Sequence, residues 1–181
     1  MILSETMRMK ELVDGILTIS RLDSHDTRLR TEVISLGEFI EEQIDILQGL
    51  GIAEKVSIGM EKEQEDIRVS ADPSLLGKAF QNVVNNCARY AQSSVTVSLK
   101  REGEWAAVCV KDDGPGLDEK EIPHLFERFY RADASRGEKS GFGLGLAIAD
   151  TIAWEHKGAL KAESDAASTR FTFTMPLRKQ A

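Results

Sequence analysis

The stretch PSLLGKAFQNVVNNCARYA, residues 73–91, decides the fold, because its spacing predicts an amphipathic helix that must pack on a core. Asp72 precedes it as a favourable N-cap, and Pro73 suits the first helical turn. Apolar residues recur at helical spacing on one face: Leu76, Ala79, Phe80, Val83, Val84 and Cys87. A buried helix of this kind requires further elements on both sides to cover it.

A row of polar side chains on another face of this helix is the first candidate functional feature. Asn82, Asn86 and Arg89 follow one another at i, i+4 and i+7, and Tyr90 flanks the row. Asparagine is a poor helix former, so helix propensity does not explain the row. An asparagine oxygen is the hard ligand that Mg²⁺ prefers, and an arginine fork suits phosphate oxygens. A solvated polar face is the competing interpretation.

Strands and helices alternate along the rest of the chain. We expect strands at 32–35, 56–60, 67–70, 95–100, 106–111, 159–164 and 169–175, and further helices at 36–50, 118–127 and 144–156. The strands arrive mostly in hairpin order. This order favours an α+β fold, a two-layer sandwich with helices on one face of a mixed sheet, over a doubly wound parallel sheet. Residues 130–142 are polar and glycine-containing, and we expect a mobile loop there.

An apolar stripe marks the first 23 residues as one more helix. The residues at a/d-like spacing are Ile2, Met9, Leu12, Ile16 and Ile19. Val13 and Leu17 lie next to this seam and widen the stripe. The stripe must pack on the following domain, on a second copy of itself, or on a partner helix. Polar residues 24–31 predict a linker after this helix.

Composition narrows the function classes. The 181 residues suffice for one domain with a short appendage, and the net charge of −7 argues against nucleic-acid binding or contact with an anionic membrane. Cys87 and Cys109 are far apart and lack metal-ligand spacing, so we interpret both as small core residues in a reducing compartment. No apolar run reaches the length of a transmembrane helix, so we expect a cytoplasmic segment.

Two glycine-containing motifs follow the asparagine row. DDGPG, residues 112–116, ends an apolar strand; its first carboxylate can accept a hydrogen bond from an exocyclic amine, although a plain turn explains the motif equally well. SGFGLGLAIAD, residues 140–150, places alternating glycines at the start of a helix, where backbone N–H groups can bind an anion. These glycines come late in the chain, after a polar loop, which excludes a dinucleotide-binding fingerprint.

Taken in order, four motifs resemble those of sensor histidine kinases, members of the gyrase/Hsp90/histidine-kinase/MutL ATPase superfamily with the Bergerat ATP-binding fold. NVVNNCARYA (82–91), DDGPG (112–116), LFERFYRAD (125–133) and GFGLGLAI (141–148) resemble the N, G1, F and G2 boxes. ETMRMKELVDGILTISRLDS (5–24) resembles the second helix of the dimerisation and phosphoacceptor hairpin. The resemblance implies two parts, with residues 1–28 as hairpin helix and linker and residues 29–181 as the catalytic ATP-binding domain.

The resemblance also implies roles at matched positions. Asn86 would ligate Mg²⁺ with support from Asn82, Asp112 would bind the adenine amino group, and Arg89 and Arg131 would contact phosphates of ATP or ADP. The remaining expected nucleotide contacts are Tyr90, Gly114, Gly116, Phe126, Phe129, Gly141, Phe142, Gly143, Leu144 and Gly145. Within this set, Phe126 and Phe129 would anchor the lid and the last three glycines would hinge it. Both phenylalanines could equally be core aromatics.

Several residues depart from the usual pattern of that family. Cys87 replaces the usual alanine, Asp113 a commoner asparagine, and Phe142 a commoner threonine or serine. The family's acceptor histidine lies on the first hairpin helix, which we do not find. His25 superficially mimics that box, but it follows the second-helix motif. We therefore interpret the chain as a fragment that lacks its phosphoacceptor.

The implied function is transfer of the ATP γ-phosphoryl group to a histidine on a dimerisation helix absent from this chain, for signalling to a response regulator. Alone, the chain should bind nucleotide without autophosphorylating. A gyrase- or MutL-type clamp usually has glutamate where Asn82 stands. A serine kinase that acts as an anti-sigma factor is a nearer alternative, against which the first helix and FERFYR (126–131) speak. A degenerate nucleotide-binding interaction module is disfavoured by the presence of Asn86 and Asp112.

Overall fold

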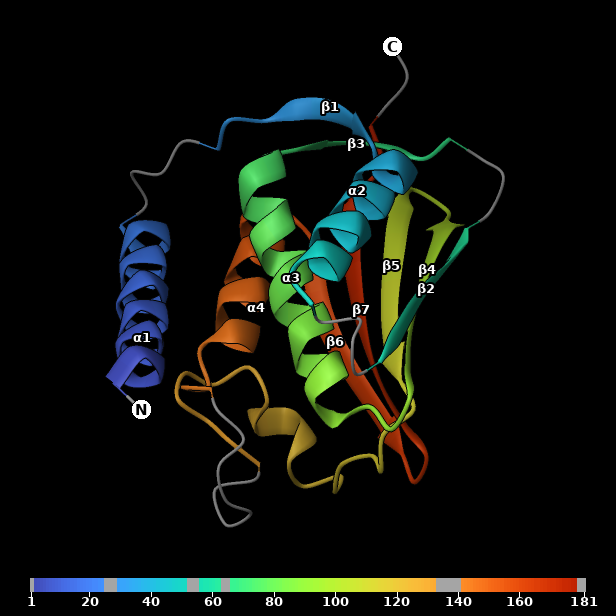
Figure 1. Ribbon diagram of the computed structural model, residues 1–181. Helices are drawn as coiled ribbons and strands as arrows, with labels where there is room; N and C mark the ends of the chain where they lie inside the picture. Colours follow the sequence, from blue (N-terminus) through green and yellow to red (C-terminus); the bar gives the residue numbers. More distant parts are fainter. Residues whose placement is uncertain (1, 25–28, 52–55, 63–65, 133–140, 179–181) are drawn as a thin grey trace.

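A mixed sheet of five strands forms one layer of the molecule (Figure 1). The computed structural model describes residues 2–24, 29–51, 56–62, 66–132 and 141–178. The strands lie in the order β2 (Ser57–Lys62), β4 (Ser94–Glu102), β5 (Trp105–Asp112), β7 (Ser168–Pro176) and β6 (Ala159–Asp165). Only β2 and β4 pair in parallel; the other neighbours in this sheet are antiparallel. The expected α+β class is confirmed.

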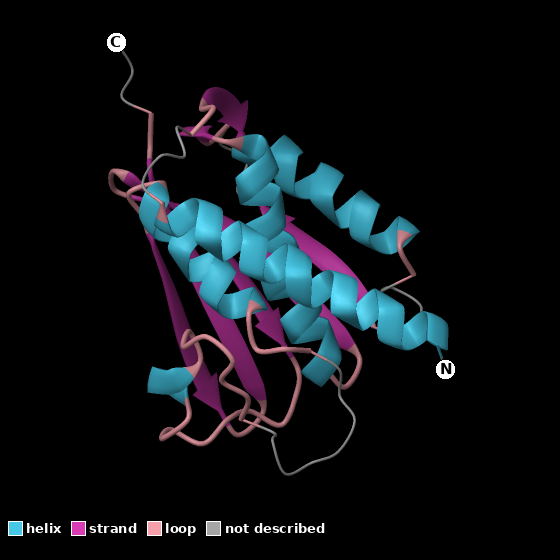
Figure 2. Ribbon diagram, turned by 90° about the vertical axis from the view of Figure 1, so that its left-hand side faces the viewer, coloured by secondary structure: helices cyan, strands magenta, loops and turns pink. Residues whose placement is uncertain are grey.

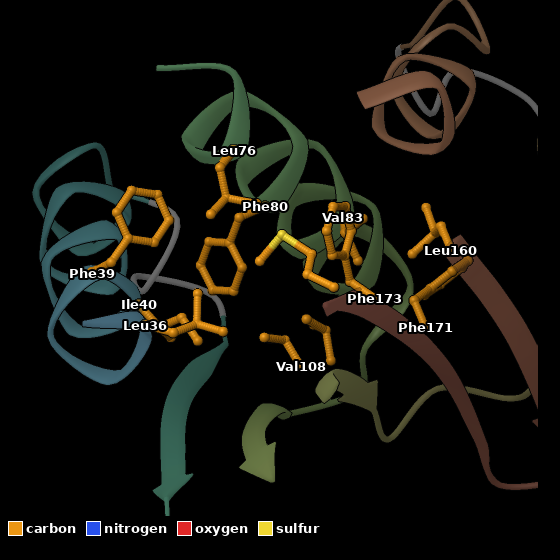
Figure 3. Close-up of a pocket in the computed structure, with 12 residues that line it drawn as sticks. Leu36, Phe39, Ile40, Leu76, Phe80, Val83, Val108, Leu160, Phe171 and Phe173 are labelled. Atoms are coloured by element: carbon orange, nitrogen blue, oxygen red, sulfur yellow. The ribbon is translucent and has the colours of Figure 1, made fainter. Parts of the chain in front are cut away.

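Three helices form the second layer and cover one face of the sheet (Figure 2). They are α2 (Leu36–Gly49), α3 (Pro73–Tyr90) and α4 (Gly145–Glu155). The apolar face predicted for α3 is buried, from Leu76 to Cys87. Figure 3 shows side chains of α2 and α3 converging on those of the sheet around a small apolar cavity of about 20 Å³. The core therefore lies between the two layers.

A second, two-stranded sheet was not expected from the sequence. β1 (Glu32–Ser35) pairs antiparallel with β3 (Arg68–Ala71), and Val69 of β3 forms an isolated bridge with Leu177 near the chain's end. Both strands were expected, but not that they form a sheet of their own. The small sheet connects the end of the linker to the strand that leads directly into α3.

The segment 118–127, expected to be a short helix, forms only one 3₁₀ turn, η2 (Ile122–His124). Its backbone bonds are of the i to i+3 type, with Glu121 N–H donating to the Asp118 carbonyl at 2.9 Å and His124 N–H to the Glu121 carbonyl at 3.0 Å. Pro123 lies in the middle of the segment. Its ring lacks an N–H and clashes with the preceding turn of an α-helix, which disfavours one uninterrupted helix through residues 118–127.

The N-terminal helix α1 (Ile2–Asp23) lies beside α4 (Figures 1 and 2). Ile19 and Leu22 are buried, and Gly15 approaches so closely that a Cβ there would lie 3.2 Å from Cδ1 of Leu144. Met9, by contrast, is 67% exposed, and Val13 is 52% exposed. Among the described side chains of the stripe, Ile19 is therefore buried against the following domain, and Leu12 packs partly buried against the same core. No helix in the described part of the chain is both long and apolar enough to span a membrane.

Asp72 joins the parts of the chain that meet at the start of α3. Its carboxylate accepts the backbone N–H groups of Ser74 and Leu75 at 3.1 and 3.2 Å, which confirms the predicted N-cap. The same carboxylate accepts the Arg30 N–H at 3.0 Å. The Asp72 backbone N–H donates to Nε2 of the buried His156, just past the end of α4, at 3.0 Å.

Replacing Asp72 with alanine should therefore lower the free energy of unfolding by about 1–2 kcal/mol, because a buried helix start loses its cap. Urea denaturation measures the change. Asp72→Asn, whose amide oxygen can still accept at the cap, should lose less. An alanine variant as stable as the parent protein would contradict this assignment.

Candidate functional site

The asparagine row lies along α3 on the side of α4 and the glycine-rich segment. Asn82 and Asn86 are half-buried, Arg89 is exposed and Tyr90 is half-buried. Asn85, beside the row in sequence, is exposed. The row thus runs from the packed middle of the helix to its open C-terminal end.

The glycine-rich segment meets this row at two points. A Cβ at Gly141 would lie against the Arg89 guanidinium, 3.1 Å from Cζ, and Gly141 itself has φ +155°. Four residues later, at the first residue of α4, a Cβ at Gly145 would lie 3.6 Å from the amide carbon of Asn82. Leu144, which immediately precedes α4, is buried, and Phe142 packs partly buried against the core. The N-terminus of α4 therefore faces the polar row of α3.

One polar atom in this contact has no partner in the described part of the protein. The amide nitrogen of Asn82 is buried and makes no hydrogen bond there. A buried donor left unpaired costs free energy, so such groups call for an explanation. A ligand with acceptor oxygens between α3 and the start of α4 would supply the missing partner.

Asp112 ends β5 with its side chain inside the protein and only 2% of its surface exposed. Its carboxylate accepts the Gly114 N–H at 2.9 Å. Burial raises the pKa of Asp112 above its usual value, while hydrogen bonds from Gly114, Cys87 and Thr169 act in the opposite direction. A buried carboxylate at a strand end, with oxygen lone pairs to spare, can accept a hydrogen bond from a ligand.

The backbone after Asp112 passes very close to the end of α3. A Cβ at Gly114 would stand 2.5 Å from the Tyr90 carbonyl oxygen and 2.8 Å from an Asp112 carboxylate oxygen. Gly116 has φ +73°, and a Cβ there would clash with the Asp165 carbonyl. The two glycines let the DDGPG segment lie between α3 and the β6–β7 turn without side chains of their own.

Side chains from the β6–β7 hairpin support this segment, and the sequence had not indicated them. The Ser164 hydroxyl accepts the Leu117 N–H at 2.8 Å, donates to the Ser168 carbonyl at 3.0 Å and lies 3.0 Å from the Thr169 hydroxyl. Thr169 is buried and pairs with Asp112 across β5 and β7. Serine and threonine are common in strands, so no local signal distinguishes these two.

Asp113, noted as a departure from the family's asparagine, organises the turn between α3 and β4. Its carboxylate accepts the backbone N–H groups of Gln92, Ser93 and Ser94 at 2.8, 3.0 and 3.1 Å, and the hydroxyls of both serines. The Ser93 hydroxyl and these N–H groups hold the pKa of Asp113 well below its ordinary value. Asp113 therefore ties the DDGPG segment to the turn that follows α3.

The FERFYR segment is joined to the glycine-rich segment through the backbone. Phe129 N–H donates to the Gly143 carbonyl at 2.9 Å, and Phe129 has φ +66° and is 60% exposed. Phe126, by contrast, packs partly buried against the core. Gly143, at φ +70°, allows the close approach. Arg131 is exposed, and residues 133–140, within the expected mobile loop, lie outside the described residues.

An ion pair outside the predicted set joins this segment to α1. Arg128 donates to both carboxylate oxygens of Asp23, each at 2.8 Å. Together with Ile16, Ile19 and Phe129, the pair lines a cleft of about 400 Å³ between α1 and the segment. The spacing of two charges 105 residues apart carries no local signal, so sequence reasoning could not find the pair.

Substituting Gly114 with alanine should destabilise the protein by about 1–3 kcal/mol, because the new methyl group would overlap the Tyr90 carbonyl. Thermal or urea denaturation would show the loss. Gly59→Ala is the matched control, since a Cβ at Gly59 meets nothing within 4 Å. Equal stability of the two variants would rule out the close approach.

Asp113 should make stability depend on acid pH. Folding lowers the pKa of Asp113 below the ordinary value of 3.8 that it has in the unfolded chain. The ionised carboxylate therefore stabilises the folded protein fully above that ordinary pKa, and the stabilisation is lost as pH falls through the lower pKa of the folded state. Asn at this position cannot titrate. The difference in unfolding free energy between the parent protein and Asp113→Asn should therefore be constant between about pH 5 and 7 and should change below the ordinary value. A pH-independent difference would contradict the hydrogen-bonded carboxylate.

Comparisons with known proteins identify the family of this chain and several relatives. The family described as "Histidine kinase-, DNA gyrase B-, and HSP90-like ATPase" matches residues 71–179. "Signal transduction histidine-protein kinase AfsQ2" of Streptomyces coelicolor is 32% identical over 164 residues, which is 91% of this chain and 30% of that protein. "Sensor histidine kinase TrcS" of Mycobacterium tuberculosis is 35% identical over 185 residues, 98% of this chain and 36% of that protein.

A solved structure extends the agreement to the fold. "Mycobacterial sensor histidine kinase MprB" superposes with a TM-score of 0.72 at 27% identity, covering 82% of this chain and 100% of that one. The chain spans about a third of the length of the two curated relatives. The family match covers the asparagine row, Asp112 and the glycine-rich segment together. This chain belongs to the histidine kinase-, DNA gyrase B- and HSP90-like ATPase family.

Proposed function

We propose that this chain is the ATP-binding catalytic part of a two-component sensor histidine kinase. The observation that carries the proposal is the convergence of three motifs, in which Gly141 lies against Arg89, Gly145 against Asn82, and Gly114 between Asp112 and Tyr90. Family membership supports nucleotide binding, and both curated relatives compared above are named as histidine kinases.

The adenine end of the nucleotide would lie at Asp112. Its buried carboxylate would accept a hydrogen bond from the exocyclic amine. Gly114 and Gly116 would help by letting the segment after Asp112 pack closely against the Tyr90 and Asp165 carbonyls, which fixes the backbone beside the carboxylate. Tyr90 would flank the base. Nucleotides whose purine lacks this amine should bind less well, because the buried Asp112 carboxylate would be left without the hydrogen bond that the amine donates.

The triphosphate would lie between α3 and the N-terminus of α4. Asn86 would ligate Mg²⁺, and the unpaired amide nitrogen of Asn82 fits a phosphate oxygen. Arg89 would add a charged fork, and backbone N–H groups from Gly143 onward would stabilise negative charge. Arg131, Phe142 and Leu144 would complete the phosphate side. When bound, Mg²⁺ would neutralise charge on the phosphate oxygens.

In the reaction, the bond between the γ-phosphorus and its bridging oxygen breaks, and a bond to an imidazole nitrogen forms, which leaves ADP and phosphohistidine. The residues of this chain would position and neutralise rather than exchange protons. The acceptor would be supplied by a dimerisation helix of the same or a sister chain, and the phosphoryl group would pass on to a response-regulator receiver domain. The proposed division is residues 1–28 for the hairpin helix with its linker and 29–181 for the catalytic domain.

The buried His156 is poorly suited as an acceptor. His156 is buried, with Nε2 accepting from Asp72 and Nδ1 within 2.7 Å of the Ile152 carbonyl, so both ring nitrogens are used. His124 is exposed and pairs with Glu127 at 2.7 Å. His25 lies outside the described residues.

Calorimetric titration with ADP, with and without Mg²⁺, tests the nucleotide site. Asn86→Ala should weaken the Mg²⁺-dependent affinity by about tenfold or more, because the metal loses a ligand. Asn85→Ala removes an exposed asparagine one position away and should leave affinity unchanged. Absence of ADP binding by the unaltered chain at up to millimolar concentration would instead favour the degenerate interaction module.

Phosphoryl transfer is tested by adding a hairpin-only protein that carries an acceptor histidine, together with ATP labelled in the γ position. The hairpin should gain acid-labile label, and this chain alone should not. The Asn86→Ala variant should abolish the signal. Label on a histidine of this chain in the absence of the hairpin would contradict the assignment of the acceptor to another segment.

A further inference from the structure

The ion pair between the last turn of α1 and the FERFYR segment has no role in the proposed function. One guanidinium nitrogen of Arg128 donates to both carboxylate oxygens of Asp23, each at 2.8 Å. Both side chains are about half exposed. An isolated exposed ion pair contributes little to stability. The importance of this pair therefore depends on what its two partners hold in place.

The end of α1 is a firm support for Asp23. Ile19 and Leu22 are buried against the following domain. Between them and the middle of the helix, the half-buried Lys78 of α3 donates a hydrogen bond to the Thr18 hydroxyl. Asp23 is the last residue of α1 and directly follows Leu22. Its carboxylate is therefore carried by a helix turn that is itself packed on the domain.

On the other side of the pair, Arg128 precedes a residue with an unfavourable backbone. Phe129 has φ +66°, in the left-handed region that costs a bulky residue free energy. Such a conformation persists only where the surroundings hold it. The Phe129 N–H donates to the Gly143 carbonyl at 2.9 Å, and the ion pair with Asp23 holds the residue just before it. The segment is thus held at two adjacent points.

Gly143 connects this contact to the polar row of α3. Two residues before it, a Cβ at Gly141 would lie 3.1 Å from Cζ of Arg89, and two residues after it, a Cβ at Gly145 would lie 3.6 Å from the amide carbon of Asn82. The carbonyl that accepts from Phe129 therefore lies in the middle of the segment that contacts both ends of the row. A shift of the FERFYR segment would be felt there.

We propose that Asp23 and Arg128 are positioning residues for the phosphate side of the nucleotide site. Their ion pair holds Phe129 in the conformation in which its N–H binds Gly143, and this bond fixes the glycine-rich segment beside α3. The inference rests on the proposed nucleotide site. Without the pair, the Phe129 backbone relaxes and releases Gly143, so the segment has to be ordered when phosphates bind, which costs affinity. Nucleotide affinity therefore depends on where the end of α1 lies, and bound nucleotide in turn strengthens the contact with α1.

Titration with two ligands separates this role from a general loss of structure. ADP reaches the phosphate side, whereas adenosine would bind only at the Asp112 end. In Asp23→Asn the ADP affinity should fall about two- to fivefold, the size expected for one exposed ion pair, and the adenosine affinity should not change. Arg128→Asp should show the same loss. The charge-reversed double variant, Asp23→Arg with Arg128→Asp, should recover most of the ADP affinity because it restores the pair.

Asp66→Asn is the matched control. Asp66 accepts from Arg68 at 2.7 Å, and its side chain is 51% exposed, against 48% for Asp23. This variant also removes one carboxylate charge from an exposed ion pair, but the pair lies at the start of β3, in the small sheet. Both the ADP and the adenosine affinity should stay as in the unaltered chain.

Hydrogen exchange of one amide reports the link without any nucleotide. The Phe129 N–H is bonded to the Gly143 carbonyl, so its exchange with solvent requires this bond to open. In Asp23→Asn the amide should exchange about two- to fivefold faster, because the conformation that forms the bond is less populated. In Asp66→Asn its exchange should be unchanged. Solvent-exchange NMR on the assigned Phe129 amide measures both rates.

The outcomes distinguish the two proposals. Absence of ADP binding by the unaltered chain overturns the proposed function and the positioning role with it. If ADP binds, the positioning role alone is overturned by an Asp23→Asn variant that keeps full ADP affinity, or that loses ADP and adenosine affinity by the same factor. A double variant that binds ADP no better than Arg128→Asp overturns it as well, and so does Phe129 exchange that ignores the loss of the pair. In these cases the nucleotide site stands.

Discussion

The hydrogen bonds of Asp72 hold the architecture together at the point where the end of β3, the start of α3, the linker and the end of α4 meet. The Asp72 side chain caps α3 and also accepts the backbone N–H of Arg30 in the linker. The Asp72 backbone N–H donates to His156, just past the end of α4. The two helices that face each other across the candidate site are therefore fixed at the end opposite to it. Because the cap sets where α3 begins, it also sets where Asn82, Asn86 and Arg89 lie along its axis.

Much of the fold could be predicted because its signals are local. A short stretch of sequence is enough to recognise the apolar period of α3, the glycine motif before α4 and the hairpin of β4 and β5. The pairing of β1 with β3 in a sheet of their own was missed, since a strand's partner depends on tertiary packing. Pro123 was present in the sequence, but its effect on the expected helix was overlooked.

The candidate site shows the same division. Asn82, Asp112 and Gly141 could be selected because their residue types are unusual where they occur, and the structure brings their surroundings together. The supports from Ser164 and Thr169 could not be selected, because such residues are ordinary in strands. Phe129 shows a further limit of reasoning from residue type. An apolar aromatic side chain suggests a core position, but the Phe129 backbone pairs with Gly143 and the residue is exposed. The two cysteines also differ, since Cys87 is buried and Cys109 only partly so.

The parallel pairing of β2 with β4 has a consequence for folding. Parallel neighbours cannot be joined by a tight turn, and here the connection between them runs through β3 and the whole of α3. The edge of the sheet can therefore close only after this long crossover has been ordered, which raises the contact order of this half of the molecule. We expect β2 to be among the last strands to gain protection from hydrogen exchange during refolding, and its protection to report whether α3 is in place.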